Sequence, residues 1–173
     1  QLRAIPAEEK TRLDEALLRA ALSHPWTAQA DTVLLYSSVP PEPDTIPLIQ
    51  ALLLQEKTVA LPKCTAPGEM HFAVIPAYAP PHIASGAYGI TEPTGEEHPR
   101  LTERTLCIVP GVAFTADGAR LGQGGGFYDR FLAQHPALRT IALTYRRMLQ
   151  EEIPCEAHDC RIQAVLTEQD LGG

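Results

Sequence analysis

The stretch Arg120-Leu-Gly-Gln-Gly-Gly-Gly-Phe-Tyr-Asp129 joins two segments of different character. Before it, Leu106-Cys-Ile-Val109 is a short apolar run of the kind found in buried strands, and Pro110-Gly111 ends that run. After it, residues 127–134 are expected to form a helix that the chain enters directly from the glycines. A strand, a glycine-rich connection and a helix in this order are typical of an α/β fold.

The same alternation extends over the rest of the chain. Helices are expected at residues 6–24, where leucines recur at helical spacing, and at 44–53, which Asp44 can cap. Further strands are expected at residues 31–36, 58–61, 71–75, 140–143 and 164–166. Residues 76–100 are rich in proline, glycine and histidine, which indicates a surface excursion or lid. The pattern predicts one domain over residues 1–173, with a mostly parallel central sheet covered on both faces.

Composition limits the classes of function. The chain has 14 basic and 21 acidic residues, a net charge of −7, which argues against a nucleic-acid partner. No apolar run approaches the roughly 20 residues that span a bilayer, and no signal-peptide pattern opens the chain. We therefore expect a cytoplasmic protein with no membrane partner, and a monomer. An anionic ligand would have to be held locally, by backbone amides, a metal and a few basic side chains.

The glycine run is a candidate anion site. Gly122, Gly124, Gly125 and Gly126 allow positive φ and a close approach of backbone N–H groups, and they precede a helix N-terminus. The run is neither a Walker loop nor a GxGxxG motif. On this pattern alone, phosphate binding and a structural turn are equally compatible with the sequence.

The residues beside the glycines favour phosphate binding. Arg120 can add a bidentate contact to a phosphate, and Tyr128 offers a stacking face. Asp129 supplies a hard oxygen ligand suited to magnesium, although an acid in a first helical turn also complements the helix dipole.

The four cysteines do not indicate a disulfide framework, because no CxxC pair is present and four cysteines are few for a chain of this length. Cys155, His158 and Cys160 supply three soft ligands without a fourth, which is a poor zinc signature. We interpret them as ordinary loop and core residues.

The segment Pro110-Gly-Val-Ala-Phe114, followed by Gly118-Ala-Arg-Leu-Gly-Gln-Gly-Gly-Gly-Phe-Tyr-Asp-Arg130, resembles the hallmark of the 5-formyltetrahydrofolate cyclo-ligase family. That hallmark reads roughly PG-x-x-F-x-x-x-G-x-RLG-x-G-x-G-Y-YD. Other segments follow in the family's order and extend the resemblance over nearly the whole chain: Tyr36-Ser with Glu42-Pro-Asp-Thr45, Leu61-Pro-Lys63, Tyr88-Gly-Ile-Thr-Glu-Pro93, and Ile153-Pro to His158-Asp159.

The resemblance implies a three-layer α/β/α fold of the type seen in CoA transferases and sugar-phosphate isomerases, with MgATP beside a reduced formyl folate in one cleft. The implied catalytic residues are Arg120, which would neutralise phosphate, and Glu42, which would hydrogen-bond the pterin. The magnesium ligands would be Asp129 and Asp159. The implied ATP contacts are Arg120, Leu121, Gly122, Gln123, Gly124, Gly125, Gly126, Phe127 and Tyr128. The implied folate contacts are Ser37, Glu42, Tyr88, Gln123, Gly124, Gly125, Gly126 and Phe127.

The family reaction uses ATP to phosphorylate the formyl oxygen of 5-formyltetrahydrofolate, so that N10 can attack and phosphate can leave. Positioning and charge neutralisation would supply most of the catalysis. Two alternatives remain. One is a non-catalytic relative that binds folate or nucleotide, and the other is a sugar-phosphate isomerase on a similar scaffold, for which the sequence shows no acid/base constellation.

The sequence departs from the family pattern in three places. A basic segment of K-x-x-x-R type, which touches ATP in the family, would align upstream of Gln1 and is expected to be absent from residues 1–173. Phe127 replaces the first tyrosine of the hallmark, so stacking is retained and a hydroxyl is lost. Met148 stands where glutamine is common.

Overall fold

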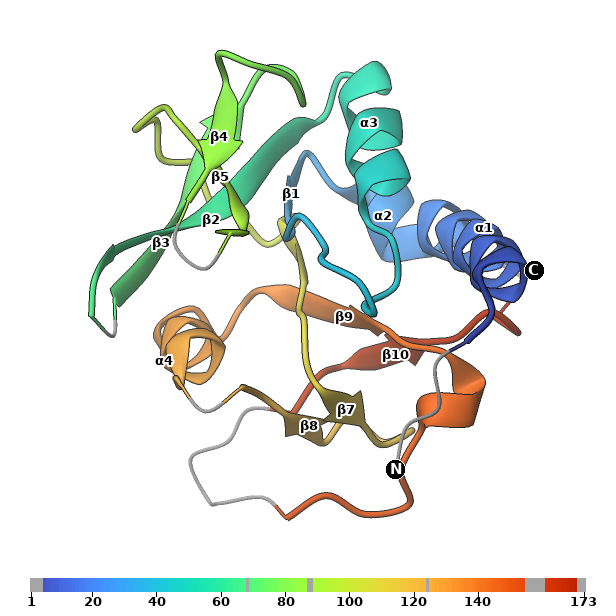
Figure 1. Ribbon diagram of the computed structural model, residues 1–173. Helices are drawn as coiled ribbons and strands as arrows, with labels where there is room; N and C mark the ends of the chain where they lie inside the picture. The colour runs from blue at the N-terminus through green and yellow to red at the C-terminus, as the bar shows by residue number, and fades with distance from the viewer. Residues whose placement is uncertain (1–4, 68, 87–88, 124, 155–160, 171–173) are drawn as a thin grey trace.

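The computed structural model describes residues 5–67, 69–86, 89–123, 125–154 and 161–170. Within these ranges six strands form one sheet in the order β10-β9-β6-β1-β2-β3 (Figure 1). All neighbours pair in parallel except β2 and β3, so the prediction of a mostly parallel sheet is confirmed. The strands are β1 (Thr32–Leu34), β2 (Thr58–Ala66), β3 (Glu69–Ile75), β6 (Leu106–Ile108), β9 (Arg139–Leu143) and β10 (Ala164–Leu166).

The three predicted helices are present, and the described residues contain two additional short helical segments. The helical segments are α1 (Ala7–Ser23), α2 (Pro25–Gln29), α3 (Ile46–Leu54), α4 (Phe127–Gln134) and a 3₁₀ turn, η2 (Arg146–Met148). Asp44 was expected to cap α3, but Thr45 occupies the N-cap position. The Asp44 carboxylate accepts the N–H of Ile46 at 3.1 Å, so it still binds a free N–H at the start of the helix. The short α2 was not predicted, since five residues are too few for a periodic signal.

Side chains of the sheet alternate between two covered faces. Val33 and Leu35 lie in the same buried cluster as residues of α1 and α3. Leu34, which points the other way, belongs to the cluster that contains Leu132 of α4. Figure 1 shows α1 and α3 together on one side of the molecule and α4 on the other. The three-layer α/β/α arrangement is thus confirmed.

Strand β2 is longer than predicted. It was expected to stop at Pro62, yet it continues to Ala66 as one arm of an antiparallel hairpin with β3. Proline is tolerated there because β1 has already ended opposite Ala60, so β2 needs no further hydrogen bonds on that side.

The expected surface excursion contains ordered structure. Strands β4 (Ile83–Ser85) and β5 (Thr91–Pro93) form an antiparallel pair. This pair lies beside β2, where the N–H of Cys64 donates to Glu92 Oε2 at 3.2 Å and Lys63 Nζ donates to the Gly95 carbonyl at 3.2 Å. Residues 92–95 of the excursion are therefore anchored to β2.

Candidate active site at the switch point of the sheet

The order of the strands defines where a ligand would bind. From β1 the chain first builds β2 and β3 on one side, then returns to place β6 on the other side of β1. In open parallel sheets, ligands bind outside the carboxyl ends of the strands at such a switch point. The two loops that leave the carboxyl ends of these neighbouring strands are residues 35–45, which follow β1, and 109–126, which follow β6.

The loop after β1 is held by its own side chains. The Thr45 hydroxyl donates to the Tyr36 carbonyl at 2.6 Å and accepts the N–H of Ser38 at 3.0 Å. The Oγ of Ser38 in turn accepts the N–H of Thr45 at 2.9 Å. Ser37, predicted to contact folate, is 5% exposed, and its Oγ lies 2.6 Å from the Tyr78 hydroxyl. Ser37 therefore stands at the floor of the loop.

Glu42 lies in the same loop with its carboxylate turned inward. Glu42 Oε1 accepts the N–H of Val39 at 2.8 Å. Burial raises the pKa of Glu42, while the Val39 hydrogen bond acts in the opposite direction. Burial is the main cause of the raised pKa of Tyr36 and of Tyr128, and the charge of Glu42 contributes to both. The Glu42 carboxylate is therefore partly withdrawn from solvent within its loop.

The loop after β6 reaches the glycines through a small hairpin. Strands β7 (Ala113–Phe114) and β8 (Arg120–Leu121) pair in antiparallel fashion, and the turn between them contains Gly118. Gly118 has φ +97°, and a Cβ there would lie 2.1 Å from the Ile162 carbonyl oxygen. Only glycine fits this position, so the hairpin can dock on the chain just before β10.

Arg120 lies beneath the glycine run. Its side chain is 6% exposed, and Nη1 donates to the Pro110 carbonyl at 2.9 Å. Nη2 lies 3.6 Å from Asp129 Oδ1, and the guanidinium carbon is 5.7 Å from the centre of the Tyr128 ring. A Cβ on Gly122 would come within 2.9 Å of the guanidinium. The arginine thus supports the loop from the protein side, and its predicted contact with phosphate stays a prediction.

The first turn of α4 carries the other predicted groups. Asp129 is 27% exposed at its side chain. The ring of Tyr128 meets Phe72 edge-on at 6.3 Å, and its buried hydroxyl has no hydrogen-bond partner among the described residues. Phe127 faces the guanidinium of Arg130 at 5.6 Å. The Tyr128 side chain is therefore partly packed in the protein interior. Its predicted stacking on a ligand stays a prediction.

Three predicted site residues, Tyr88, Gly124 and Asp159, lie outside the described residues, as do Cys155, His158 and Cys160. Gln123 and Leu121 are exposed on the run. Among the described residues, no group of three or more histidine, cysteine or acidic side chains is arranged to hold a metal ion. Asp129 is the one predicted magnesium ligand whose surroundings are described, and its partly exposed carboxylate is a suitable oxygen donor.

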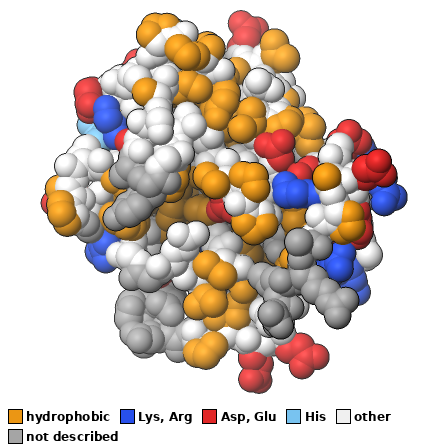
Figure 2. Space-filling view, viewed as in Figure 1, with side chains coloured by type: hydrophobic (Ala, Val, Ile, Leu, Met, Phe, Trp, Pro, Cys, Tyr) orange, Lys and Arg blue, Asp and Glu red, His pale blue; other side chains and the backbone are white. Residues whose placement is uncertain are grey.

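The face seen in Figure 2 is hollowed near its centre, and hydrophobic side chains line the hollow. Compared with Figure 1, the hollow falls between β5, α4 and the chain that leaves β6. This is the place to which the switch point directs a ligand. An apolar hollow with a few polar groups at its edge suits a flat aromatic ligand.

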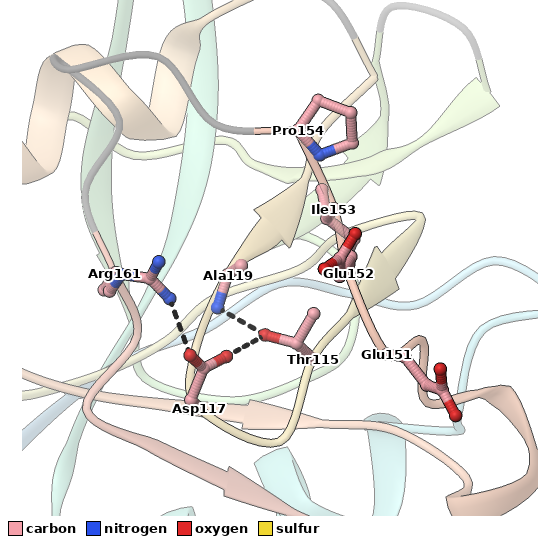
Figure 3. Close-up of a pocket in the computed structure, with 8 residues that line it drawn as sticks. All are labelled: Thr115, Asp117, Ala119, Glu151, Glu152, Ile153, Pro154 and Arg161. Atoms are coloured by element: carbon pink, nitrogen blue, oxygen red, sulfur yellow. Dashed lines mark hydrogen bonds and ion pairs between the residues drawn. The ribbon is translucent and has the colours of Figure 1, made fainter.

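A separate hollow of about 270 Å³ lies at the turn of the β7–β8 hairpin (Figure 3). Asp117 and Arg161 face each other there at 3.2 Å. The residues that line it are Thr115, Asp117, Ala119, Glu151, Glu152, Ile153, Pro154 and Arg161. None of the predicted site residues in the described ranges is among them, so this hollow is distinct from the candidate site.

Arg130 and Tyr78 touch the site but were not predicted. Arg130 donates to the Gly125 carbonyl at 2.7 Å. Its position just after Asp129 was a usable signal, because side chains in a first helical turn lean back over the preceding loop. Tyr78 gave no such signal, since only the tertiary fold brings the segment after β3 to Ser37.

These observations define an α/β/α protein with a candidate ligand site at the switch point of a mostly parallel sheet. The model of the 5-formyltetrahydrofolate cyclo-ligase family matches residues 1–168, and the chain belongs to this family. Within the part of the chain that the structure describes, no helix combines the length and apolar character needed to cross a bilayer.

Individual relatives agree with this assignment. The 5-formyltetrahydrofolate cyclo-ligase of Haemophilus influenzae is 32% identical over 167 residues, covering 94% of this chain and 89% of the relative. That of Mycolicibacterium smegmatis is 36% identical over 143 residues, covering 79% of this chain and 73% of the relative. The NMR structure of Aquifex aeolicus 5,10-methenyltetrahydrofolate synthetase matches with a TM-score of 0.80 and 32% identity, covering 95% of this chain and 82% of that one.

Proposed function

We propose that this chain catalyses the ATP-dependent conversion of 5-formyltetrahydrofolate to 5,10-methenyltetrahydrofolate, with release of ADP and phosphate. The observation that carries the proposal is that the Glu42 loop and the glycine run follow the neighbouring strands β1 and β6 at one switch point, in a chain that matches the family over residues 1–168. One side of the cleft would receive the folate and the other the triphosphate. We also propose that the protein works as a cytoplasmic monomer, without nucleic-acid or membrane partners.

The chemical problem is a poor leaving group. The formyl oxygen of an amide-like group does not depart on its own, whereas phosphate does. Transfer of the terminal phosphoryl group of ATP to that oxygen lets N10 attack the formyl carbon and form the C–N bond of the new ring. N10 releases its proton to solvent, and the C–O bond to phosphate breaks. The protein then mainly has to align two substrates and balance charge.

The described residues suit these tasks. The backbone N–H groups of the glycine run and the first turn of α4 would face the phosphates, with the charge of Arg120 close beneath. Glu42, which is half-buried and accepts the N–H of Val39, would accept hydrogen bonds from the donor edge of the pterin. Asp129, with Asp159 as its predicted partner, would hold Mg²⁺, which neutralises phosphate charge when bound. We assign no general base.

The direct test combines the protein with Mg²⁺, ATP and 5-formyltetrahydrofolate and follows the near-ultraviolet absorbance of the methenyl product. We expect product only when all three are present, with one ADP formed per product. Binding of the folate without ATP consumption would instead support the non-catalytic alternative. The full-length protein of the source should be used, so that any residues upstream of Gln1 are included.

A further inference from the structure

The peptide between Gly125 and Gly126 has two possible orientations in the glycine run. Neither residue has a side chain to restrict it, and Gly126 is the N-cap of α4 at φ +70° without a side-chain capping bond. In a trans peptide the C=O and the N–H point in opposite directions. One orientation therefore presents a donor to an anion at the helix start, and the other presents a carbonyl oxygen that repels it.

Arg130 contacts both ends of this peptide from one side. Its Nη2 donates to the Gly125 carbonyl at 2.7 Å, and its guanidinium lies over the Phe127 ring at 5.6 Å. A Cβ on Gly126 would lie 2.6 Å from Arg130 Nη1, so the arginine occupies the space that a side chain at Gly126 would need. The helix geometry explains the approach, because side chains in the first turn lean toward the N-terminus.

We infer that Arg130 is a positioning residue that fixes this peptide. By holding the Gly125 carbonyl on its own side, it keeps the N–H of Gly126 directed to the opposite side, as an anion-binding loop requires. Arg130 acts from the solvent side, whereas the buried Arg120 supports Gly122 from beneath. The orientation of the peptide is independent of the reaction; its consequence for MgATP rests on the proposed function.

Steady-state kinetics of Arg130→Ala test the consequence. We expect KM for ATP to rise about tenfold, and KM for 5-formyltetrahydrofolate to change by less than about twofold, because only the phosphate side is disturbed. Arg130→Lys keeps a charged donor and should recover part of the loss. Arg139→Ala is the matched control, since Arg139 also lies over an aromatic ring, Trp26 at 5.6 Å, and donates to Gln29 at 2.8 Å, away from the site.

A second measurement does not depend on turnover. In ¹⁵N relaxation-dispersion NMR of the ligand-free protein, the Gly125 and Gly126 amides should show microsecond-to-millisecond exchange in Arg130→Ala but not in the wild type or in Arg139→Ala. Unchanged glycine amides in Arg130→Ala would overturn the inference, as would an equal rise of KM for both substrates. An inactive wild type would refute the proposed function alone, and the NMR result would still decide the role of Arg130.

Discussion

The two walls of the candidate site are held in place in different ways. Residues 36–45 are fixed from within, by Thr45, Ser38 and Glu42, each of which hydrogen-bonds the backbone of the same loop. The glycine run has almost no side chains of its own, so arginines outside it hold its shape. Arg120 packs beneath Gly122, and Arg130 binds the Gly125 carbonyl.

This difference follows from what each wall has to bind. A wall for a pterin must offer side-chain acceptors, and side chains that serve the ligand can also brace the loop. A wall for phosphates must offer bare backbone N–H groups, which excludes side chains from the surface that meets the ligand. Rigidity then has to come from elsewhere in the chain.

Loss of a charged side chain should lower activity more beside the glycine run than in the loop after β1. Asp129→Asn removes a carboxylate from the site of the proposed Mg²⁺ while conserving shape, and we expect kcat to fall by at least about a hundredfold. Circular dichroism and the unfolding midpoint should stay close to wild type. Turnover near the wild-type rate in this variant would show that Asp129 is not the metal ligand.

Loss of the support beneath the glycines should also destabilise the fold. Arg120→Met keeps the apolar stem but leaves the Pro110 carbonyl and Asp129 without the guanidinium. We expect the free energy of unfolding to fall by about 2–3 kcal/mol in urea titrations, because the partly buried Pro110 carbonyl loses a charged donor and the packing of the guanidinium is lost. Arg139→Met is the control and should lose less than about 1 kcal/mol. Equal losses in the two variants would contradict the supporting role.

The wall after β1 can be weakened through a single hydroxyl. Thr45 is fully buried, and Thr45→Val conserves its shape while removing one donor and one acceptor. We expect a loss of about 2 kcal/mol in the free energy of unfolding, and a larger rise in KM for the folate than for ATP. Thr11→Val, at an exposed hydroxyl bonded to the Ala7 carbonyl, should change stability by less than about 0.5 kcal/mol. A KM for the folate equal to that of the wild type would show that this loop does not contribute to folate binding.

The smallest effect concerns the pH dependence of stability. Burial raises the pKa of Glu42, so between its ordinary value and the raised one the folded protein holds more protons than the unfolded chain. The contribution of Glu42 to the free energy of unfolding is therefore greatest below that window and decreases as pH rises through it. Glu42→Gln should remove this decrease, as measured by urea unfolding at steps from about pH 4 to pH 7. An identical slope in both proteins would show that Glu42 is not desolvated.

Much of the fold was predictable because burial leaves a repeating pattern in the sequence. The leucines of α1, the apolar run of β6 and the glycine-to-helix transition at α4 all appear within a few residues of their predicted positions. Segments without such a pattern were missed. Strands β7 and β8 have two residues each, α2 has five, and the antiparallel β2–β3 hairpin depends on pairing between segments rather than on either one.

The sequence by itself determined the class of protein and the residues available to form its site. Strand and helix periodicity, glycine content and the family hallmark are all local properties of the chain. Only the tertiary structure decided where the side chains of these residues lie and which groups they contact. It turned the Glu42 carboxylate onto the Val39 N–H, turned Arg120 inward beneath the run and laid Arg130 over Gly125. The physical reason is that side-chain direction depends on which carbonyls and rings lie within reach, and strand order sets these neighbours.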